Sequence, residues 1–120
     1  MKRVAIFASG KGTNAEKIIE KCRENIALIV SNNPLAGVIE IARKHNIPFI
    51  ILNKEDFYKS ENLIHDLRNH RINFIALAGF LWRIPPYLLK YFPKKIINLH
   101  PALLPKFGGK GMYGLNVHRV

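Results

Sequence analysis

A chain of 120 residues with 48% hydrophobic content has room for one domain with a modest core, and it is short for an α/β enzyme. Lys and Arg outnumber Asp and Glu by 19 to 8, and all eight carboxylates lie within residues 1–66, so the net charge of +11 comes mainly from the C-terminal half. The basic residues are spread among predicted strand ends and loops instead of being interleaved with aromatic residues on one face. We therefore expect small anionic ligands and no nucleic-acid partner.

The single cysteine and the short N-terminal apolar run narrow the class of protein further. Cys22 has no second thiol with which to form a disulfide within the chain, and no cluster of thiols offers a metal site. The apolar residues 4–8 are too few for a signal peptide or a membrane span. We expect a cytoplasmic protein with no membrane partner, in which Cys22 is a small apolar residue of a helix.

Short apolar runs alternate with amphipathic segments along the chain. The runs are typical of strands covered on both faces, and they occupy residues 4–8, 26–30, 48–52, 74–78 and 95–99. Four helical patterns lie between them. The first begins at a Thr13/Glu16 capping box, and the second runs from the turn at 31–34 to about Lys44. The third includes residues 63–67, and the fourth runs from Pro85 to about Tyr91. This alternation predicts an α/β fold with a Rossmann-like, mostly parallel sheet and helices on both faces.

Ligands of such sheets bind outside the carboxyl ends of the strands. Three segments that follow predicted strands are chemically unusual, and they are residues 9–14, 79–84 and 98–110. We expect these three segments to converge on one site.

Residues 9–14, Ser-Gly-Lys-Gly-Thr-Asn, join the first strand to the first helix. Their glycines permit a tight turn, the free N–H groups at the helix start favour a phosphate, and Lys11 adds a positive charge. The pattern matches neither the Walker signature nor the three-glycine dinucleotide fingerprint. An ordinary strand-to-helix turn capped by Thr13 is the alternative.

Residues 77–86 follow the fourth predicted strand. Gly79 permits close approach of the backbone to a ligand, and the side chains of Leu81, Trp82 and Ile84 are large enough to form one wall of a pocket for a flat aromatic ligand. Packing of the same side chains in the core, followed by a loop that ends at prolines, is the alternative.

Asn98 and His100 lie two residues apart at the end of the fifth predicted strand, so strand periodicity points both toward the same side. An imidazole beside an amide donor can protonate a leaving group and stabilise an oxyanion, which acyl transfer requires. A carboxylate usually holds the pKa of such an imidazole near neutral pH. The alternative is a hydrogen-bonded histidine at a strand end.

Three motifs carry a resemblance to a known family: residues 9–14, residues 77–80 (Leu-Ala-Gly-Phe) and residues 98–106 (Asn-Leu-His-Pro-Ala-Leu-Leu-Pro-Lys). In order and spacing they resemble the N-terminal part of the phosphoribosylglycinamide formyltransferases. The third motif is shared with methionyl-tRNA formyltransferase and formyltetrahydrofolate deformylase, whereas the loop at residues 12–14 distinguishes this family. The resemblance implies transfer of a formyl group from 10-formyltetrahydrofolate, as co-substrate, to the amine of glycinamide ribonucleotide in de novo purine (IMP) biosynthesis.

The resemblance also implies a role for each residue of these motifs. The phosphate of the ribonucleotide would be bound by Gly12, Thr13 and Asn14. The pterin of the folate would contact, largely through backbone groups, the segment Leu81, Trp82, Arg83 and Ile84. Asn98 would hydrogen-bond the formyl oxygen, and His100 would act as general acid and base. The implied partners are small molecules, and no metal is implied.

The chain departs from the family pattern in lacking a carboxylate partner for His100. Members of the family continue beyond the matched part, where they carry the carboxylate partner of the catalytic imidazole, but no Asp or Glu follows Asp66 here. We therefore expect residues 1–120 to form an N-terminal formyltransferase domain that is incomplete at its C-terminus, ends inside the next helix and has impaired activity. Uncovered sheet edges would favour self-association.

Two other functions fit parts of the sequence. A non-catalytic remnant that binds phosphate or folate, or a fragment that needs a complementing chain, would also have a basic half and exposed edges. A dinucleotide-dependent oxidoreductase would have the same fold, but this chain lacks the third glycine of its fingerprint and the acidic residue after the second strand.

Overall fold

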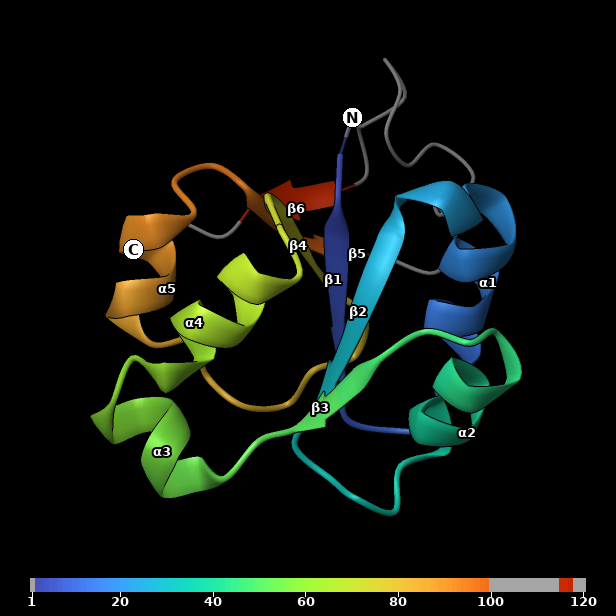
Figure 1. Ribbon diagram of the computed structural model, residues 1–120, viewed down its shortest axis with the longest axis horizontal. Coiled ribbons are helices and arrows are strands. Elements are labelled where there is room, and N and C mark those ends of the chain that lie inside the picture. Colours follow the sequence, from blue (N-terminus) through green and yellow to red (C-terminus); the bar gives the residue numbers. More distant parts are fainter. Residues whose placement is uncertain (1, 100–114, 118–120) are drawn as a thin grey trace.

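The five apolar runs form the parallel strands of one central sheet in the computed structural model, which describes residues 2–99 and 115–117 (Figure 1). The parallel strands are β1 (Val4–Ala8), β2 (Ile26–Ser31), β3 (Phe49–Ile51), β4 (Phe74–Leu77) and β5 (Ile96–Leu99). A further strand, β6 (Leu115–Val117), pairs antiparallel with β5. The strand order is β3-β2-β1-β4-β5-β6, so the predicted mostly parallel sheet is confirmed.

Helices cover both faces of this sheet (Figure 1). One face carries α1 (Thr13–Cys22) and α2 (Gly37–Lys44), and a short 3₁₀ helix, η1 (Arg23–Asn25), follows α1. The other face carries α3 (Lys54–Lys59), α4 (Asn62–Asn69) and α5 (Pro86–Tyr91). None of the helices in the described part of the chain is long and apolar enough to cross a membrane.

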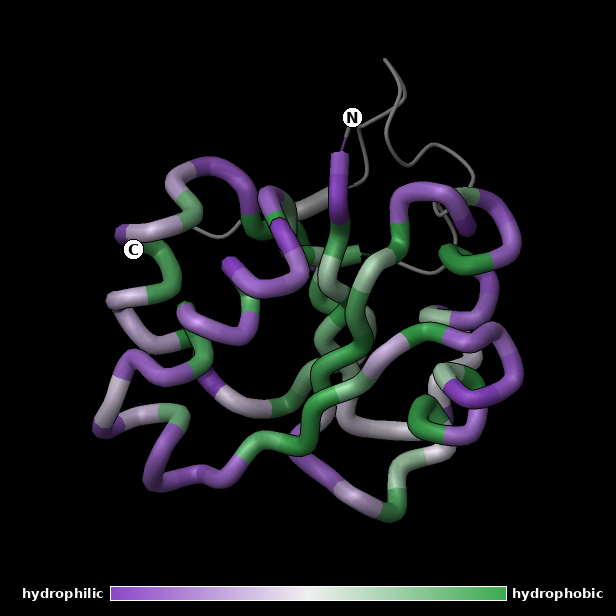
Figure 2. Tube along the Cα trace, viewed as in Figure 1, coloured by the Kyte–Doolittle hydropathy of each residue, from purple (hydrophilic) through white to green (hydrophobic). Residues whose placement is uncertain are grey.

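The core is divided by the sheet into two apolar layers, and β1 contributes to both. Val4, Ile6 and Ala8 pack toward α1 and α2, whereas Ala5 and Phe7 pack toward α3, α4 and α5. All five residues are buried. Figure 2 shows the resulting concentration of hydrophobic residues along the central strands. A strand covered on both faces has no position for a polar side chain, which explains why the sequence reads as a continuous apolar run.

The start of α1 differs from the prediction. The helix begins at Thr13 itself, Gly12 occupies the N-cap position, and no side chain caps the helix, so the predicted Thr13/Glu16 capping box is wrong. The Glu16 carboxylate instead accepts a hydrogen bond from the Lys44 ammonium at 3.0 Å, and this bond holds the pKa of Glu16 below its usual value. Glu16 therefore connects α1 to the end of α2. Cys22 lies on a helix as predicted, as the last residue of α1. It is half-buried, and burial raises the pKa of its thiol.

Three further elements differ from the sequence prediction. α2 starts at Gly37 and not at the 31–34 turn, because the Asn33 side chain accepts the Leu35 N–H and holds these residues in a turn. α3 was not predicted at all. The chain was expected to end inside a helix, whereas residues 115–117 form the strand β6, which pairs with β5.

Candidate active site

The strand order reverses between β1 and β4, which are neighbours in the sheet although β2 and β3 lie between them in the chain. Ligands of open α/β sheets bind in the crevice outside the carboxyl ends of the strands at such a reversal. The carboxyl ends of both strands lie at the lower edge of the sheet in Figure 1. Residues 9–14, here called the first loop, leave β1 at this edge, and residues 79–84, the second loop, follow β4.

Hydrogen bonds join the two loops. The Ser9 N–H donates to the Gly79 carbonyl at 3.3 Å, which continues the pairing of β1 with β4 beyond the strands. The Leu81 N–H then donates to the Ser9 hydroxyl oxygen at 2.8 Å. Ser9 is only 6% exposed, so the acceptor end of this bond is shielded from water. The first two of the three segments that were predicted to converge therefore do so.

The first loop is packed tightly against the start of α2. Gly12 has a φ of +87°, and a Cβ built on it would lie 2.7 Å from the Val38 Cα. A Cβ on Gly37 would lie 2.5 Å from the Lys11 carbonyl oxygen, and the Val38 N–H donates to the Gly10 carbonyl at 3.3 Å. The glycines are therefore required by backbone conformation and close approach, and α2 fixes the path of the loop. Thr13 is exposed and Asn14 is half-buried at its end.

The second loop turns the side chains of Trp82 and Ile84 inward. Ile84 is 8% exposed, and the Trp82 ring packs against Phe57 with 5.8 Å between ring centroids. The predicted alternative of core packing therefore applies to these two side chains. Leu81 is 82% exposed, and Arg83 is also exposed. The loop thus presents the Leu81 side chain and main-chain groups at the edge of the sheet.

Helix α3 braces the second loop, and sequence reasoning missed it. The Tyr58 hydroxyl donates to the Arg83 carbonyl at 2.8 Å, and the Tyr58 ring lies 6.1 Å from Trp82. A sequence signal for α3 did exist. Asn53 caps the helix by accepting the Asp56 N–H at 3.0 Å, which is the spacing of an ordinary N-terminal cap.

Asn98 lies on β5, one strand away from the second loop. It pairs with Leu77 of β4 on one side and with Asn116 of β6 on the other, and it is half-buried. Its position places it at the same carboxyl edge as the two loops. His100 and the rest of the segment 100–110 lie outside the residues that the structure describes.

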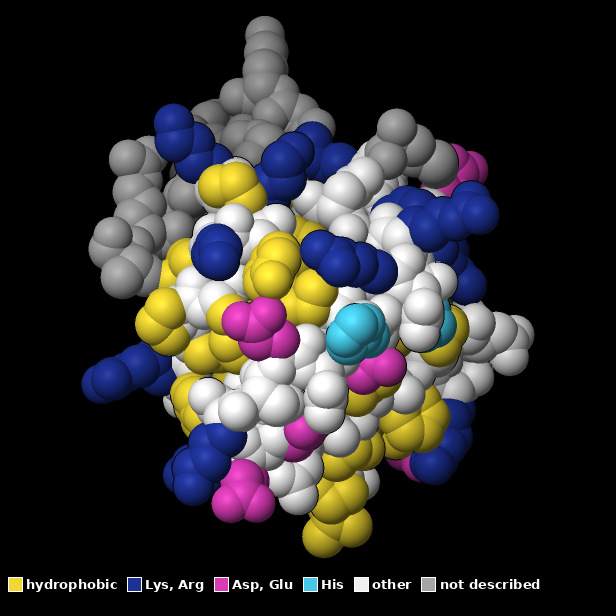
Figure 3. Space-filling model, turned by 60° about the vertical axis from the view of Figure 1, so that its left-hand side comes forward, with side chains coloured by type: hydrophobic (Ala, Val, Ile, Leu, Met, Phe, Trp, Pro, Cys, Tyr) yellow, Lys and Arg dark blue, Asp and Glu magenta, His cyan; other side chains and the backbone are white. Residues whose placement is uncertain are grey.

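The charged groups are unevenly distributed around the sheet. All eight carboxylates lie on helices or directly before one. Exposed basic residues gather at the opposite, amino edge of the sheet, toward the top of Figure 3: Lys2, Arg3, Arg68, Arg71, Lys94 and Lys95. No group of three or more His, Cys, Asp or Glu side chains in the described part of the chain could hold a metal ion.

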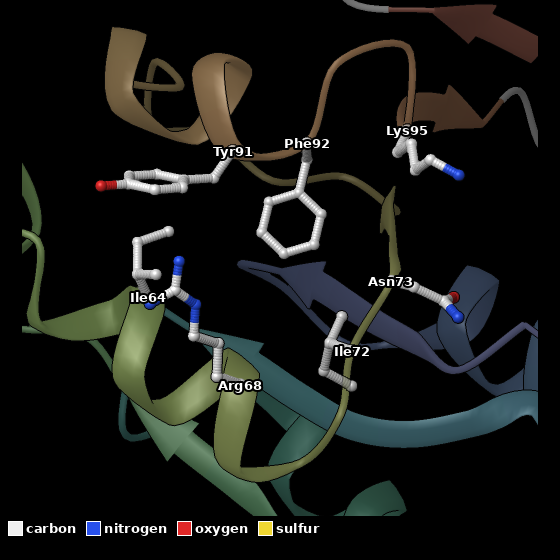
Figure 4. A pocket seen from close by; sticks show the side chains of 7 residues that line it. All are labelled: Ile64, Arg68, Ile72, Asn73, Tyr91, Phe92 and Lys95. Atoms are coloured by element: carbon white, nitrogen blue, oxygen red, sulfur yellow. The ribbon is translucent and has the colours of Figure 1, made fainter.

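A cavity of about 280 Å³ also lies at the amino edge, between α4 and α5 (Figure 4). It is lined by Ile64, Arg68, Ile72, Asn73, Tyr91, Phe92 and Lys95. The Arg68 guanidinium stacks on the Tyr91 ring at 5.4 Å, while Figure 4 shows Lys95 pointing away from them. The polar groups of this cavity do not converge on one point, and none of the predicted site residues lines it.

Comparison with known proteins agrees with the motifs. A family model described as formyl transferase matches residues 2–119. A chloroplastic phosphoribosylglycinamide formyltransferase from Arabidopsis thaliana is 41% identical over 129 residues, which cover 99% of this chain and 44% of the relative. The phosphoribosylglycinamide formyltransferase of Bacillus subtilis is 39% identical over 91% of this chain and 60% of its own length.

The fold agrees as well. Glycinamide ribonucleotide transformylase 1 from Geobacillus kaustophilus matches with a TM-score of 0.76 and 40% identity, over 92% of this chain and 63% of that chain. The chain spans about half the length of the curated relatives it matches, 44% and 60% in the two given above. The family model nevertheless covers almost every residue of the chain. The chain therefore belongs to the formyl transferase family.

Proposed function

We propose that this chain takes part in the transfer of a formyl group from 10-formyltetrahydrofolate to the amine of glycinamide ribonucleotide, a step of de novo purine (IMP) biosynthesis. The observation that carries the proposal is the junction of the two loops at the strand reversal, held by the Ser9 hydroxyl and the Leu81 N–H. The relatives from A. thaliana and B. subtilis bear the name of this enzyme. The partners are then small-molecule substrates, and a cytoplasmic location belongs to the same proposal.

The geometry of the first loop supports phosphate binding by Gly12, Thr13 and Asn14. Helix α1 starts after the left-handed Gly12 without a side-chain cap, so the N–H groups of its first turn receive no side-chain acceptor from the N-cap residue. Such N–H groups and the helix dipole stabilise a phosphate. The exposed Lys11 places a positive charge beside them. The ribonucleotide phosphate then anchors the substrate at the end of β1.

The second loop supports folate binding through its backbone. The segment that would contact the pterin is Leu81, Trp82, Arg83 and Ile84. Because Trp82 and Ile84 pack toward the core, the loop can offer main-chain groups and the exposed Leu81 side chain to a flat heterocycle. Main-chain donors and acceptors would fix the orientation of the ring, and Leu81 would cover one of its faces.

The proposed chemistry is an acyl transfer at the end of β5. The substrate amine attacks the formyl carbon, a C–N bond forms, and the carbonyl electron pair moves to oxygen. The Asn98 amide donates a hydrogen bond to that oxygen. His100 is the general acid and base. It accepts the proton that the attacking amine loses and donates a proton to the folate nitrogen. The bond between that nitrogen and the formyl carbon then breaks. These steps use no metal ion.

The rate expected of residues 1–120 by themselves is low. No Asp or Glu follows Asp66, and the carboxylates that precede it lie on helices or directly before one. Loss of the carboxylate that orients a catalytic histidine lowers turnover about 10⁴-fold in serine proteases. A binding module that holds the phosphate or folate ligand without transferring the formyl group is the second candidate, and the geometry of the two loops, which requires no catalytic group, favours it.

Formyl transfer by purified residues 1–120 tests the proposal, together with calorimetric titration of glycinamide ribonucleotide and of a non-transferable analogue of 10-formyltetrahydrofolate. We expect both ligands to bind and transfer to be slow. Asn98→Ala should abolish the residual transfer, and Asn69→Ala, an exposed amide at the far edge, should leave it unchanged. Binding without any transfer selects the second candidate. A folded protein that binds neither ligand contradicts both.

A further inference from the structure

The hydroxyl of Ser9 makes a contact that no motif requires. Its oxygen accepts the Leu81 N–H at 2.8 Å across 72 positions of sequence, at a residue that is 6% exposed. The Ser9 N–H simultaneously donates to the Gly79 carbonyl. One residue at the end of β1 therefore holds the second loop by both its main chain and its side chain.

A neighbouring serine shows that this contact is not a general property of strand ends. Ser31 ends β2 and pairs with Ala8 in the register of β1 and β2, and it is fully buried. Its hydroxyl oxygen accepts the N–H of Asn33, two residues further along its own loop, at 3.2 Å. Ser31 therefore shapes one loop, whereas Ser9 joins two.

The second loop has a separate attachment at its other end. The Tyr58 hydroxyl donates to the Arg83 carbonyl at 2.8 Å, and this bond does not involve the first loop. Leu81 and Arg83 are thus held from two directions, by β1 and by α3. Loss of the Ser9 hydroxyl would leave the bond of the Ser9 N–H to Gly79 and the bond of Tyr58 to Arg83, but it would release the Leu81 amide from the end of β1. The part of the second loop around Leu81 could then move relative to the first loop.

We propose that Ser9 is a positioning residue that fixes the first and second loops relative to each other, so that a ligand on one loop improves the binding of a ligand on the other. The inference rests on the proposed function, which gives each loop a ligand. When a ligand orders one loop, the Ser9 hydroxyl also restricts the other loop. The second ligand then pays a smaller entropic cost for ordering the loop to which it binds. By reciprocity, each ligand raises the affinity of the other by the same factor.

The test is calorimetry on the full chain with glycinamide ribonucleotide and the non-transferable folate analogue, each titrated alone and in the presence of the other. One buried neutral hydrogen bond corresponds to about a two- to tenfold change in an equilibrium constant. We therefore expect Ser9→Ala to reduce the mutual enhancement of binding by about that factor. Ser9→Thr, which retains the hydroxyl, should restore it, and Ser31→Ala should leave it unchanged. Tyr58→Phe should weaken binding of the folate analogue and leave binding of glycinamide ribonucleotide unchanged.

Hydrogen exchange of the Leu81 amide separates this inference from the proposed function, because it needs no ligand. In the wild-type chain the amide should exchange slowly, and in Ser9→Ala it should exchange at least about tenfold faster. Fast exchange in the wild type overturns the inference even if Ser9→Ala fails to fold. Unchanged enhancement in a folded Ser9→Ala protein also overturns it. If neither ligand binds but the Leu81 amide is protected by Ser9, the proposed function fails and the bridging contact stands.

Discussion

Single residues at the carboxyl edge set the shape of the first loop, and three glycines there experience different constraints. Gly12 has a positive φ and no space for a Cβ, since two atoms of Val38 and one of Ile41 lie within 3 Å of that position. Gly79 has a positive φ of 76° but open space around it. Gly10 has neither constraint. Backbone strain and steric exclusion can therefore be separated by one substitution at each position.

We predict that alanine destabilises the fold in the order Gly12, Gly79, Gly10. Gly12→Ala combines the cost of a left-handed alanine with overpacking and should lower the free energy of unfolding by about 3 kcal/mol. Gly79→Ala should cost about 1 kcal/mol from backbone strain alone. Gly10→Ala should be within about 0.5 kcal/mol of the wild type. Urea denaturation measures all three, and equal effects would mean that the first loop is not held by α2.

Tyr87 tests the packing on the face of the sheet that carries α3, α4 and α5. Its hydroxyl donates to the Phe57 carbonyl at 2.7 Å, and burial, assisted by the negative charges of Asp56 and Glu61, raises its pKa to about 12. An unfolded tyrosine titrates near 10, so the folded chain keeps a proton that the unfolded chain loses. The stabilisation is therefore complete below pH 10 and disappears as the pH rises from 10 to 12.

We predict that the difference in unfolding free energy between the wild type and Tyr87→Phe falls by about 1 kcal/mol between pH 10 and 12. This change is smaller than the full shift of the Tyr87 pKa implies, because the side chain is only half-buried. Urea denaturation at pH 9, 10, 11 and 12 gives the difference at each pH. A difference that stays constant would contradict the assigned environment of Tyr87.

At the scale of elements, α3 gives the second loop its support. Its Phe57 is 1% exposed, and the ring lies 6.1 Å from Phe80 and 5.8 Å from Trp82, both of which belong to the loop. Tyr58 of the same helix holds the Arg83 carbonyl. A helix of six residues is therefore attached to the second loop by rings and by a hydrogen bond.

Phe57→Leu tests this support. Loss of the ring contacts should destabilise the fold by about 1 to 2 kcal/mol and loosen the second loop. Trp82 is the only tryptophan of the chain, so its fluorescence reports the loop directly, and its emission should move to longer wavelength. Phe49→Leu, which alters a ring packed in the other core layer, is the control and should leave the emission unchanged. A red shift in the control alone would contradict the role of α3.

The sequence was sufficient for the elements whose pattern is local. The strands could be predicted because burial on both faces leaves no polar residue in β1 or β4, and none in β2 before its last residue, Ser31. The convergence of the two loops followed from the rule that parallel strands end at one edge. The Thr13 cap failed because the close approach of Val38 to Gly12 determines the helix start, and that contact is tertiary. The bond of Ser9 to Leu81 joins residues 72 positions apart and leaves no local signal.

At the scale of the whole molecule, the strongest positive charge and the candidate site lie at opposite edges of the sheet. Six exposed basic residues lie at the amino edge, and two of them, Arg68 and Lys95, line the cavity between α4 and α5, while the first loop carries Lys11 alone. Net charge therefore raises the concentration of anions around the protein without marking the site. Loop geometry at the strand reversal, and not overall charge, distinguishes the edge that we propose binds the substrates.

Amide chemical shifts of the full chain, recorded during titration with glycinamide ribonucleotide and then with the non-transferable folate analogue, locate both ligands in one experiment. We predict that the ribonucleotide shifts amides of residues 10–14 and that the folate analogue shifts amides of residues 79–84 and of Asn98. Shifts gathered instead around Arg68, Tyr91 and Lys95 at the amino edge, or no shifts in a folded chain, would contradict the assignment of the carboxyl edge as the substrate site.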